Sequence, residues 1–149
     1  MKIRTLTHSD LATLLLLYQH LHEQDEPLPS MDEVEKVWKE ILANPRMQVL
    51  GGFVDGTLVT SCTLAIIPNL TRGCRPYGIM ENVVTDTLQR KRGFGSELLR
   101  YALEYAWAKN CYKVMLLTGR KDENVFRFYE SAGFSRNGKQ AFLARAPAL

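Results

Sequence analysis

Residues 89–96 read Gln89-Arg90-Lys91-Arg92-Gly93-Phe94-Gly95-Ser96, a basic segment with two glycines on which the prediction of the whole fold depends. The apolar pattern of residues 77–85 predicts a strand before it, and the pattern up to residue 109 predicts a helix after it. A loop in this position leaves main-chain N–H groups at the helix start without acceptors, and anions bind there readily. We therefore expect a phosphate site, with an ordinary solvated turn as the alternative.

Two common phosphate-binding motifs do not fit this segment. A P-loop ends in Gly-Lys-Ser/Thr four residues after its first glycine, and no such run occurs in the chain. The dinucleotide-binding fingerprint needs a third glycine, but Leu98 stands at that position. A third pattern, Gln/Arg-x-x-Gly-x-Gly/Ala, is matched in full by residues 90–95.

This third pattern resembles the loop that binds the pyrophosphate of acetyl-CoA in N-acetyltransferases of the GNAT superfamily. A second segment, from Asn124 to Phe134, is similar to the N…FYE..GF signature of the same superfamily. The two motifs stand in the expected order and together cover residues 77–134. Residues 110–113 and 124–135 also resemble the glucosamine-6-phosphate N-acetyltransferases within the superfamily.

Length and composition predict one domain, residues 1–149, with a core of its own. The apolar share of 46% is ordinary for a globular protein. The net charge of +3 is small, and much of the excess lies between Arg90 and Arg92. This distribution indicates a local anion site rather than a nucleic-acid surface.

The cysteines and the apolar runs indicate a cytoplasmic protein without a metal site. Cys62, Cys74 and Cys111 are odd in number and lack the spacing of metal ligands, which fits a reducing compartment. The histidines, all near the first predicted helix, form no metal set. No apolar run is long enough for a signal peptide or a transmembrane helix, so no membrane partner is expected.

Strands and helices are expected in mixed order along the chain. Strands are predicted at residues 2–6, 47–54, 57–67, 77–85, 114–117 and 140–144. Helices are predicted at residues 10–23, 30–44, 95–109 and 122–132. An Asp55-Gly56 hairpin turn joins the second and third strands. This order predicts an α/β (α+β) protein, and the resemblance implies the GNAT fold, with a mixed sheet of about six to seven strands and about four helices.

Acetyl transfer from a thioester to an amine needs a base, a donor for the developing oxyanion and a proton donor for the departing thiolate. Glu81 is the candidate base, because it lies on the predicted central strand that leads into the basic loop. Partial burial would raise its pKa toward neutrality, which suits proton removal, directly or through a water. The resemblance implies a glutamate in this role. The alternatives are that Glu81 contacts substrate or faces solvent.

Tyr129 is the candidate acid. Its ordinary pKa of about 10 keeps the phenol protonated, so it can donate to a thiolate. The resemblance implies that this tyrosine lies beside the sulfur, whereas a packed core aromatic is the alternative. A route through an acetylated Cys111 is disfavoured, because no histidine lies near it in the sequence.

The resemblance also implies acetyl-CoA as the cosubstrate. Its pantetheine arm would lie between splayed strands and pair with the main chain of Val83 and Val84, with an N–H near Val83 as the oxyanion donor. The pyrophosphate would be held by residues of the basic loop: Arg90, Lys91, Arg92, Gly93, Phe94, Gly95 and Ser96. Asn124 and Phe128 match positions that contact the cofactor in relatives.

The acceptor is less well defined by the sequence. The acidic segment from Glu23 to Glu33, which includes Glu26, would attract a cationic amine, or would merely complement a helix dipole. Arg72 and Arg75 would instead bind a phosphate or carboxylate on the acceptor. We expect a small-molecule amine that attacks directly in a ternary complex. The alternatives are a protein or peptide acetyltransferase and a non-catalytic CoA sensor, and a homodimer is compatible with the resemblance.

Overall fold

A mixed sheet of five strands forms the centre of the computed structural model, which describes residues 1–22 and 24–147. The strands are β1 (Lys2–Thr5), β2 (Met47–Val54), β3 (Thr57–Ile67), β4 (Tyr77–Thr85) and β5 (Val114–Leu116). They lie in sequence order, with antiparallel pairing from β1 to β4 and parallel pairing between β4 and β5. The predicted α/β class is confirmed.

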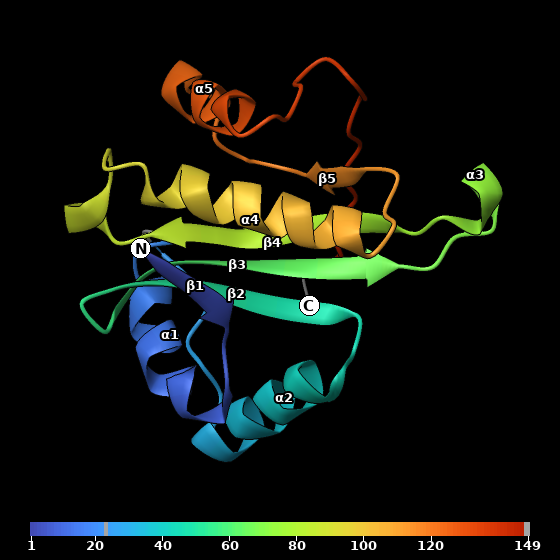
Figure 1. Ribbon diagram of the computed structural model, residues 1–149. Helices are drawn as coiled ribbons and strands as arrows, with labels where there is room; N and C mark the ends of the chain where they lie inside the picture. The colour runs from blue at the N-terminus through green and yellow to red at the C-terminus, as the bar shows by residue number, and fades with distance from the viewer. Residues whose placement is uncertain (23, 148–149) are drawn as a thin grey trace.

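Helices cover both faces of this sheet (Figure 1). The first pair, α1 (Leu11–Tyr18) and α2 (Met31–Ala43), packs on one face, and α4 (Phe94–Ala108) and α5 (Glu123–Ser131) lie on the other. The remaining helical segments are η1 (His8–Asp10), η2 (Thr87–Gln89) and the four-residue α3 (Thr71–Cys74). None of the described helices combines the length and the hydropathy that a membrane span requires.

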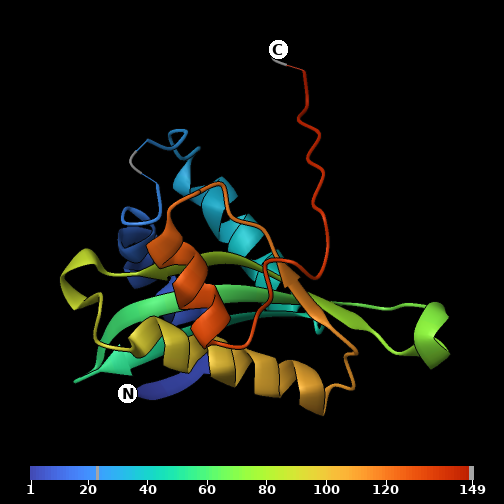
Figure 2. The same cartoon turned by 90° about the horizontal axis from the view of Figure 1, so that it is seen from above.

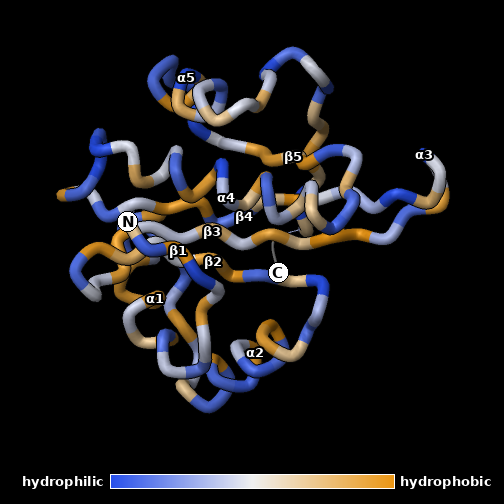
Figure 3. Tube along the Cα trace, viewed as in Figure 1, coloured by the Kyte–Doolittle hydropathy of each residue, from blue (hydrophilic) through white to orange (hydrophobic). Residues whose placement is uncertain are grey.

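The core forms where the apolar faces of the helices meet the sheet. On α4, Leu98, Leu99 and Ala102 are fully buried, at the three- and four-residue spacing of one helical face. On the opposite side of the sheet, α1 buries Leu14 and Leu17 in a second cluster. The later half of β3 runs orange in the hydropathy trace of Figure 3, and its Leu64 and Ile66 form a third cluster with Ala106 of α4. The packing of α1 and α4 thereby fixes the positions of the loops that precede and follow them.

Three expectations about the elements need correction. Residues 140–144 form no strand, so the sheet has five strands rather than six or seven; a strand requires a neighbouring main chain, and this segment has none within the described chain. The first helix ends at Tyr18 and not near Glu23, which lies outside the described residues. It ends early because His20 N–H donates to the Leu17 carbonyl at 3.0 Å, three residues back, which tightens the last turn.

The predicted hairpin is confirmed. Asp55 and Gly56 connect β2 to β3 with φ angles of +49° and +80°. Both values lie in the left-handed region, as the common two-residue hairpin turn requires.

Candidate active site

The sheet opens between β4 and β5, and this opening positions the site. Parallel pairing joins Gly78 to Val114 and ends at Met80 and Leu116, whereas β4 continues to Thr85. Residues 81–85 therefore face the β5 side without a strand partner in the described chain. Their main-chain groups on that side are available to a ligand that lies along β4 like an additional strand.

A β-bulge lies in β4 at the same place. The pairing of β3 with β4 shifts between Ser61 and Thr63, so that Asn82 and Val83 together face Cys62. Asn82 adopts a left-handed φ of +52°. A bulge leaves the extra residue unpaired and redirects its neighbours, and bulges are frequent beside active sites. Here it turns the main chain around Val83 toward the opening.

A cavity of about 820 Å³ lies at this opening. It is lined by the end of β4, residues 89–91 and 93–96, residues 20–22 after α1, the residues after β5 and the first turns of α5. Twelve of the sequence-predicted site residues line it: Glu81, Val83, Val84, Arg90, Lys91, Gly93, Phe94, Gly95, Ser96, Asn124, Phe128 and Tyr129. A second cavity of about 660 Å³ near Arg4 and Asp10 contains none of them. The candidate site residues are therefore concentrated in the first cavity.

The basic loop opens the N-terminus of α4 toward this cavity. Gly93, the residue before α4, has a φ of +84°, a conformation that glycine adopts without strain. The first main-chain hydrogen bond of α4 runs from the Glu97 N–H to the Gly93 carbonyl, at 3.0 Å. Among the described residues, the N–H groups of residues 93–96 have no acceptor. Four such donors at the positive end of a helix dipole are suited to hold an anion.

The three cations of the loop have different partners. The guanidinium of Arg90 donates to the carbonyls of Thr85 (3.1 Å) and His20 (3.0 Å), so it ties the loop to the end of β4 and to the turn after α1. Arg92 donates to the Gln89 side chain and lies outside the cavity lining. Lys91 is exposed, lines the cavity and makes no side-chain bond to another described residue. The ammonium of Lys91 is thus available to a ligand in the cavity, whereas the guanidinium of Arg90 is held by the two carbonyls.

Gly95 lies where α4, α5 and β4 meet. A Cβ at this position would lie 3.0 Å from Phe128 Cε2 and 3.1 Å from Thr85 Oγ1. These distances are shorter than ordinary van der Waals contacts, so only glycine lets the three segments approach this closely.

Replacement of Gly95 by valine is therefore expected to lower the free energy of unfolding by about 1–3 kcal/mol, because the core would have to shift. Urea titration measures the change. Gly119→Val is the matched control, since a Cβ at Gly119 meets nothing within 4 Å. Equal losses in the two variants would contradict the close approach at Gly95.

Glu81 lies on the exposed surface of the cavity. The partial burial on which the base hypothesis relied is therefore absent. Its carboxylate shares the cavity with Tyr129, and its negative charge is one of the influences that raise the pKa of that phenol. The two candidate groups are thus brought together although 48 residues separate them in the sequence.

Tyr129 is half-buried on α5. Burial raises the pKa of its phenol above the ordinary value, and the charge of Arg120 acts in the opposite direction. Its ring packs against Phe128 at 4.9 Å and Phe134 at 6.2 Å between centroids. The net effect keeps the phenol protonated at neutral pH, as a proton donor requires.

The second motif is positioned by the cap of α5. The side chain of Asp122 accepts a bond from the Val125 N–H at 3.0 Å, which fixes the first turn of the helix. Asn124, in that turn, is exposed to the cavity, and Phe128 lies one turn further against Gly95. Helix α5 thereby brings Asn124, Phe128 and Tyr129 to the cavity beside the basic loop.

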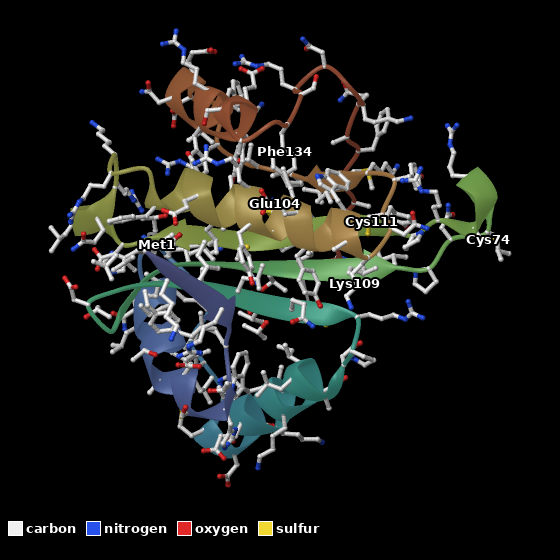
Figure 4. All side chains as sticks on the ribbon, viewed as in Figure 1. Met1, Cys74, Glu104, Lys109, Cys111 and Phe134 are labelled. Atoms are coloured by element: carbon white, nitrogen blue, oxygen red, sulfur yellow. The ribbon has the colours of Figure 1, made fainter. Side chains whose placement is uncertain are left out.

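The structure does not bring Arg72 and Arg75 to the cavity. They belong to α3 and the residue after it, and α3 projects from the far end of β4, where Figure 4 labels Cys74. Arg75 donates to the carbonyl of Cys111 at 3.3 Å, and Arg72 lies over the Tyr112 ring. The alternative nucleophile Cys111 is buried there too, outside the cavity lining.

The two remaining predictions concern Glu26 as a substrate-binding residue and the absence of a metal site. Glu26 is exposed in the segment between α1 and α2 and does not line the cavity. Among the residues that the structure describes, no group of three or more His, Cys, Asp or Glu side chains is placed to hold a metal ion.

The cavity residues that the sequence did not predict include His20, His22 and Arg120. The histidines were set aside because they form no metal set. The Nδ1 atom of His20 lies 3.1 Å from the hydroxyl of Thr87, and this contact holds His20 at the cavity. The two residues are 67 positions apart in the sequence. No local pattern signals such a contact. For Arg120, the position in the loop after β5 was an available signal, because loops at strand ends often line sites.

Comparisons of this chain with known proteins all point to acetyltransferases. The sequence pattern of the acetyltransferase (GNAT) family matches residues 14–134. The glucosamine 6-phosphate N-acetyltransferase of Trypanosoma brucei brucei is 34% identical over 143 residues, which are 96% of this chain and 95% of that protein. A putative acetyltransferase from Agrobacterium tumefaciens has 44% identity and a TM-score of 0.92, over 98% of this chain and all of that one.

A third comparison shows similarity of fold. The structure of glucosamine-6-phosphate N-acetyltransferase from Arabidopsis thaliana superposes with a TM-score of 0.83 at 22% identity, over 99% of this chain and 98% of that one.

Proposed function

The chain belongs to the acetyltransferase (GNAT) family, and we propose that it transfers the acetyl group of acetyl-CoA to the primary amine of a small molecule. One observation carries the proposal: a single cavity contains the open N-terminus of α4 at one end and both Glu81 and Tyr129. We also propose that residues 1–149 act as one domain of this family.

The residues present fit acetyl-CoA. The four N–H groups of residues 93–96 and the ammonium of Lys91 would hold the pyrophosphate. The free edge of β4 at residues 81–85 would pair with the amides of the pantetheine arm, and this would bring the thioester toward the bulge at Val83. Asn124 and Phe128 would contact the same arm from α5. When bound there, the cosubstrate supplies an activated acyl group.

In the proposed reaction the acceptor amine attacks the thioester carbonyl directly. A C–N bond forms and the C–S bond breaks, while the N–H near Val83 donates to the oxyanion that develops between these events. Glu81 takes the proton from the amine, directly or through a water, which its exposure to the cavity favours. Tyr129 donates a proton to the departing thiolate, whose ordinary pKa is near 8.5.

For the acceptor, we propose an amino-sugar phosphate as the first candidate, because the Trypanosoma relative carries that activity in its name. The carboxylate of Glu81 would attract its ammonium group, and Arg120, in the same cavity, would favour its phosphate. Arg72 and Arg75 do not line this cavity, so the proposal does not assign them this role.

A thiol-release assay with acetyl-CoA and a panel of amines tests the proposal. The panel contains glucosamine 6-phosphate, glucosamine, a polyamine and a peptide with a free N-terminus. Release of thiol that depends on a small amine is the expected result. Turnover on the peptide alone would indicate a protein acetyltransferase, and thermal stabilisation by CoA without turnover would indicate a sensor.

Glu81→Gln is expected to lower kcat/KM for the acceptor by about 10²-fold, because the amide cannot accept the proton. The measurement is the steady-state rate over a range of acceptor concentrations. Glu104→Gln, which removes an exposed carboxylate from α4 (Figure 4), is the matched control and should leave the rate unchanged. Equal rates for the two variants would remove Glu81 from the mechanism.

A further inference from the structure

The turn that follows α1, residues 19–22, reaches the cavity from the opposite side to the basic loop. Helix α1 packs on one face of the sheet, and α4 and α5 lie on the other (Figure 1). His20, Leu21 and His22 nevertheless line the cavity, together with the first turn of α4 and with Tyr129. If acetyl-CoA lies along β4 against α4 and α5, as proposed above, residues 20–22 are left as the wall that faces the acceptor.

This turn has few main-chain hydrogen bonds of its own. The N–H groups of His20 and Leu21 donate to the carbonyls of Leu17 and Tyr18, at 3.0 and 2.9 Å. Of the described residues that follow, 22 and 24–29 make no hydrogen bond to the main chain of any other described residue through their own main chain. A segment with so few bonds opens at a low free energy, so its position depends on contacts from outside the turn.

The loop after β4 supplies these contacts. The Nη2 group of Arg90 donates to the His20 carbonyl at 3.0 Å, and the Nε group of the same guanidinium donates to the Thr85 carbonyl at 3.1 Å. The hydroxyl of Thr87, in η2, lies 3.1 Å from His20 Nδ1. Figure 2 shows the yellow-green loop that contains η2 close to the end of α1. The planar guanidinium thus bridges the end of β4 and the turn after α1.

We propose that Arg90 is a positioning residue for the acceptor and not a ligand of the pyrophosphate: through His20, its guanidinium holds residues 20–22 in place beside β4. Two of its nitrogens bind carbonyls, whereas the N–H groups of residues 93–96 and the ammonium of Lys91 remain available to an anion. The identity of the two ligands rests on the proposed acetyl transfer, but the bridge itself does not.

Glutamine at position 90 separates the two roles. The pattern Gln/Arg-x-x-Gly-x-Gly/Ala accepts either residue at its first position, so Arg90→Gln keeps the motif. A glutamine side chain is shorter than that of arginine and ends in one NH₂ group, so it can replace at most one of the bonds to the carbonyls of Thr85 and His20. The variant therefore removes the bridge and leaves the main-chain N–H groups of the loop intact.

Steady-state kinetics of Arg90→Gln, with an amine of the panel that gives turnover, test this role. At saturating acetyl-CoA, KM for the acceptor is expected to rise by about 10-fold, the effect of one lost hydrogen bond from a charged donor, with kcat close to that of the wild type. The affinity for acetyl-CoA, measured by calorimetric titration, should stay the same. Arg100→Gln, which removes the same charge from the exposed side of α4, is the matched control. A loss of acetyl-CoA affinity as large as the rise in KM would overturn the proposal.

Hydrogen exchange of the free protein tests the bridge without any turnover. The amides of His20 and Leu21 are expected to exchange about 10-fold faster in Arg90→Gln than in the wild type, because the turn loses a contact that keeps it closed. Arg100→Gln should exchange like the wild type. Equal rates in Arg90→Gln and the wild type would overturn the proposal. Faster exchange without turnover on any amine would reject the proposed acetyl transfer but support the bridge.

Discussion

Replacement of Tyr129 by phenylalanine is expected to lower kcat by about 10²–10⁴-fold, the range of a general acid. The ring of Tyr129 packs between Phe128 and Phe134, so phenylalanine would keep the packing and remove only the hydroxyl. The departing thiolate would then lose its proton donor. The apparent affinity for acetyl-CoA should change far less, because the main chain of β4 and the loop before α4 provide the proposed binding contacts.

Steady-state kinetics with saturating acceptor measure this effect, with Tyr101→Phe on the exposed face of α4 as the control. The pH dependence gives a second readout. Because burial raises the pKa of Tyr129, its protonated form persists above the ordinary value of about 10, and no loss of rate from this group is expected below that pH. An unchanged kcat in Tyr129→Phe would exclude the phenol as the acid.

Reversal of two charges in the basic loop is expected to raise KM for acetyl-CoA by about 10²-fold, since a charge-assisted bond contributes about 1.5–3 kcal/mol. The variant is Lys91→Glu with Arg92→Glu. It spares Arg90, whose bonds to Thr85 and His20 hold the loop. The rate at saturating acetyl-CoA should stay close to that of the wild type, because neither residue has a role in the proposed proton transfers.

The matched control reverses two charges at the other end of α4 and before β5, with Lys109→Glu and Lys113→Glu (Figure 4 labels Lys109). This control has the same change in net charge. An equal rise of KM in both proteins would show that the effect comes from the overall charge and not from the loop.

The parts of the site that the sequence predicted are those built from neighbouring residues. The helix start at Phe94 follows from Gly93 and the apolar spacing of Leu98, Leu99 and Ala102, which are local properties. The cap of α5 follows from the residues around Asp122 in the same way. Because each segment carries its own signals, both motifs are found at their predicted positions in the fold.

The parts that the sequence did not predict depend on contacts between distant segments. The bulge at Asn82 arises from the pairing of β3 with β4, and nothing in residues 81–85 alone signals it. Arg90 was expected to hold the pyrophosphate, but its guanidinium donates to the carbonyl of His20, which lies 70 residues away in the sequence. Arg72 and Arg75 precede the central strand β4 in the sequence. The cavity lies at the C-terminal end of β4, so these two residues lie at the opposite end of that strand.

Calorimetric titration of the protein with acetyl-CoA and with acetyl-pantetheine, which lacks the pyrophosphate and the nucleotide, tests the central claim most directly. If the open N-terminus of α4 binds the pyrophosphate, acetyl-CoA will bind with measurable heat and acetyl-pantetheine will bind at least about 10²-fold more weakly. No heat with acetyl-CoA, or equal affinity for the two compounds, would contradict the account.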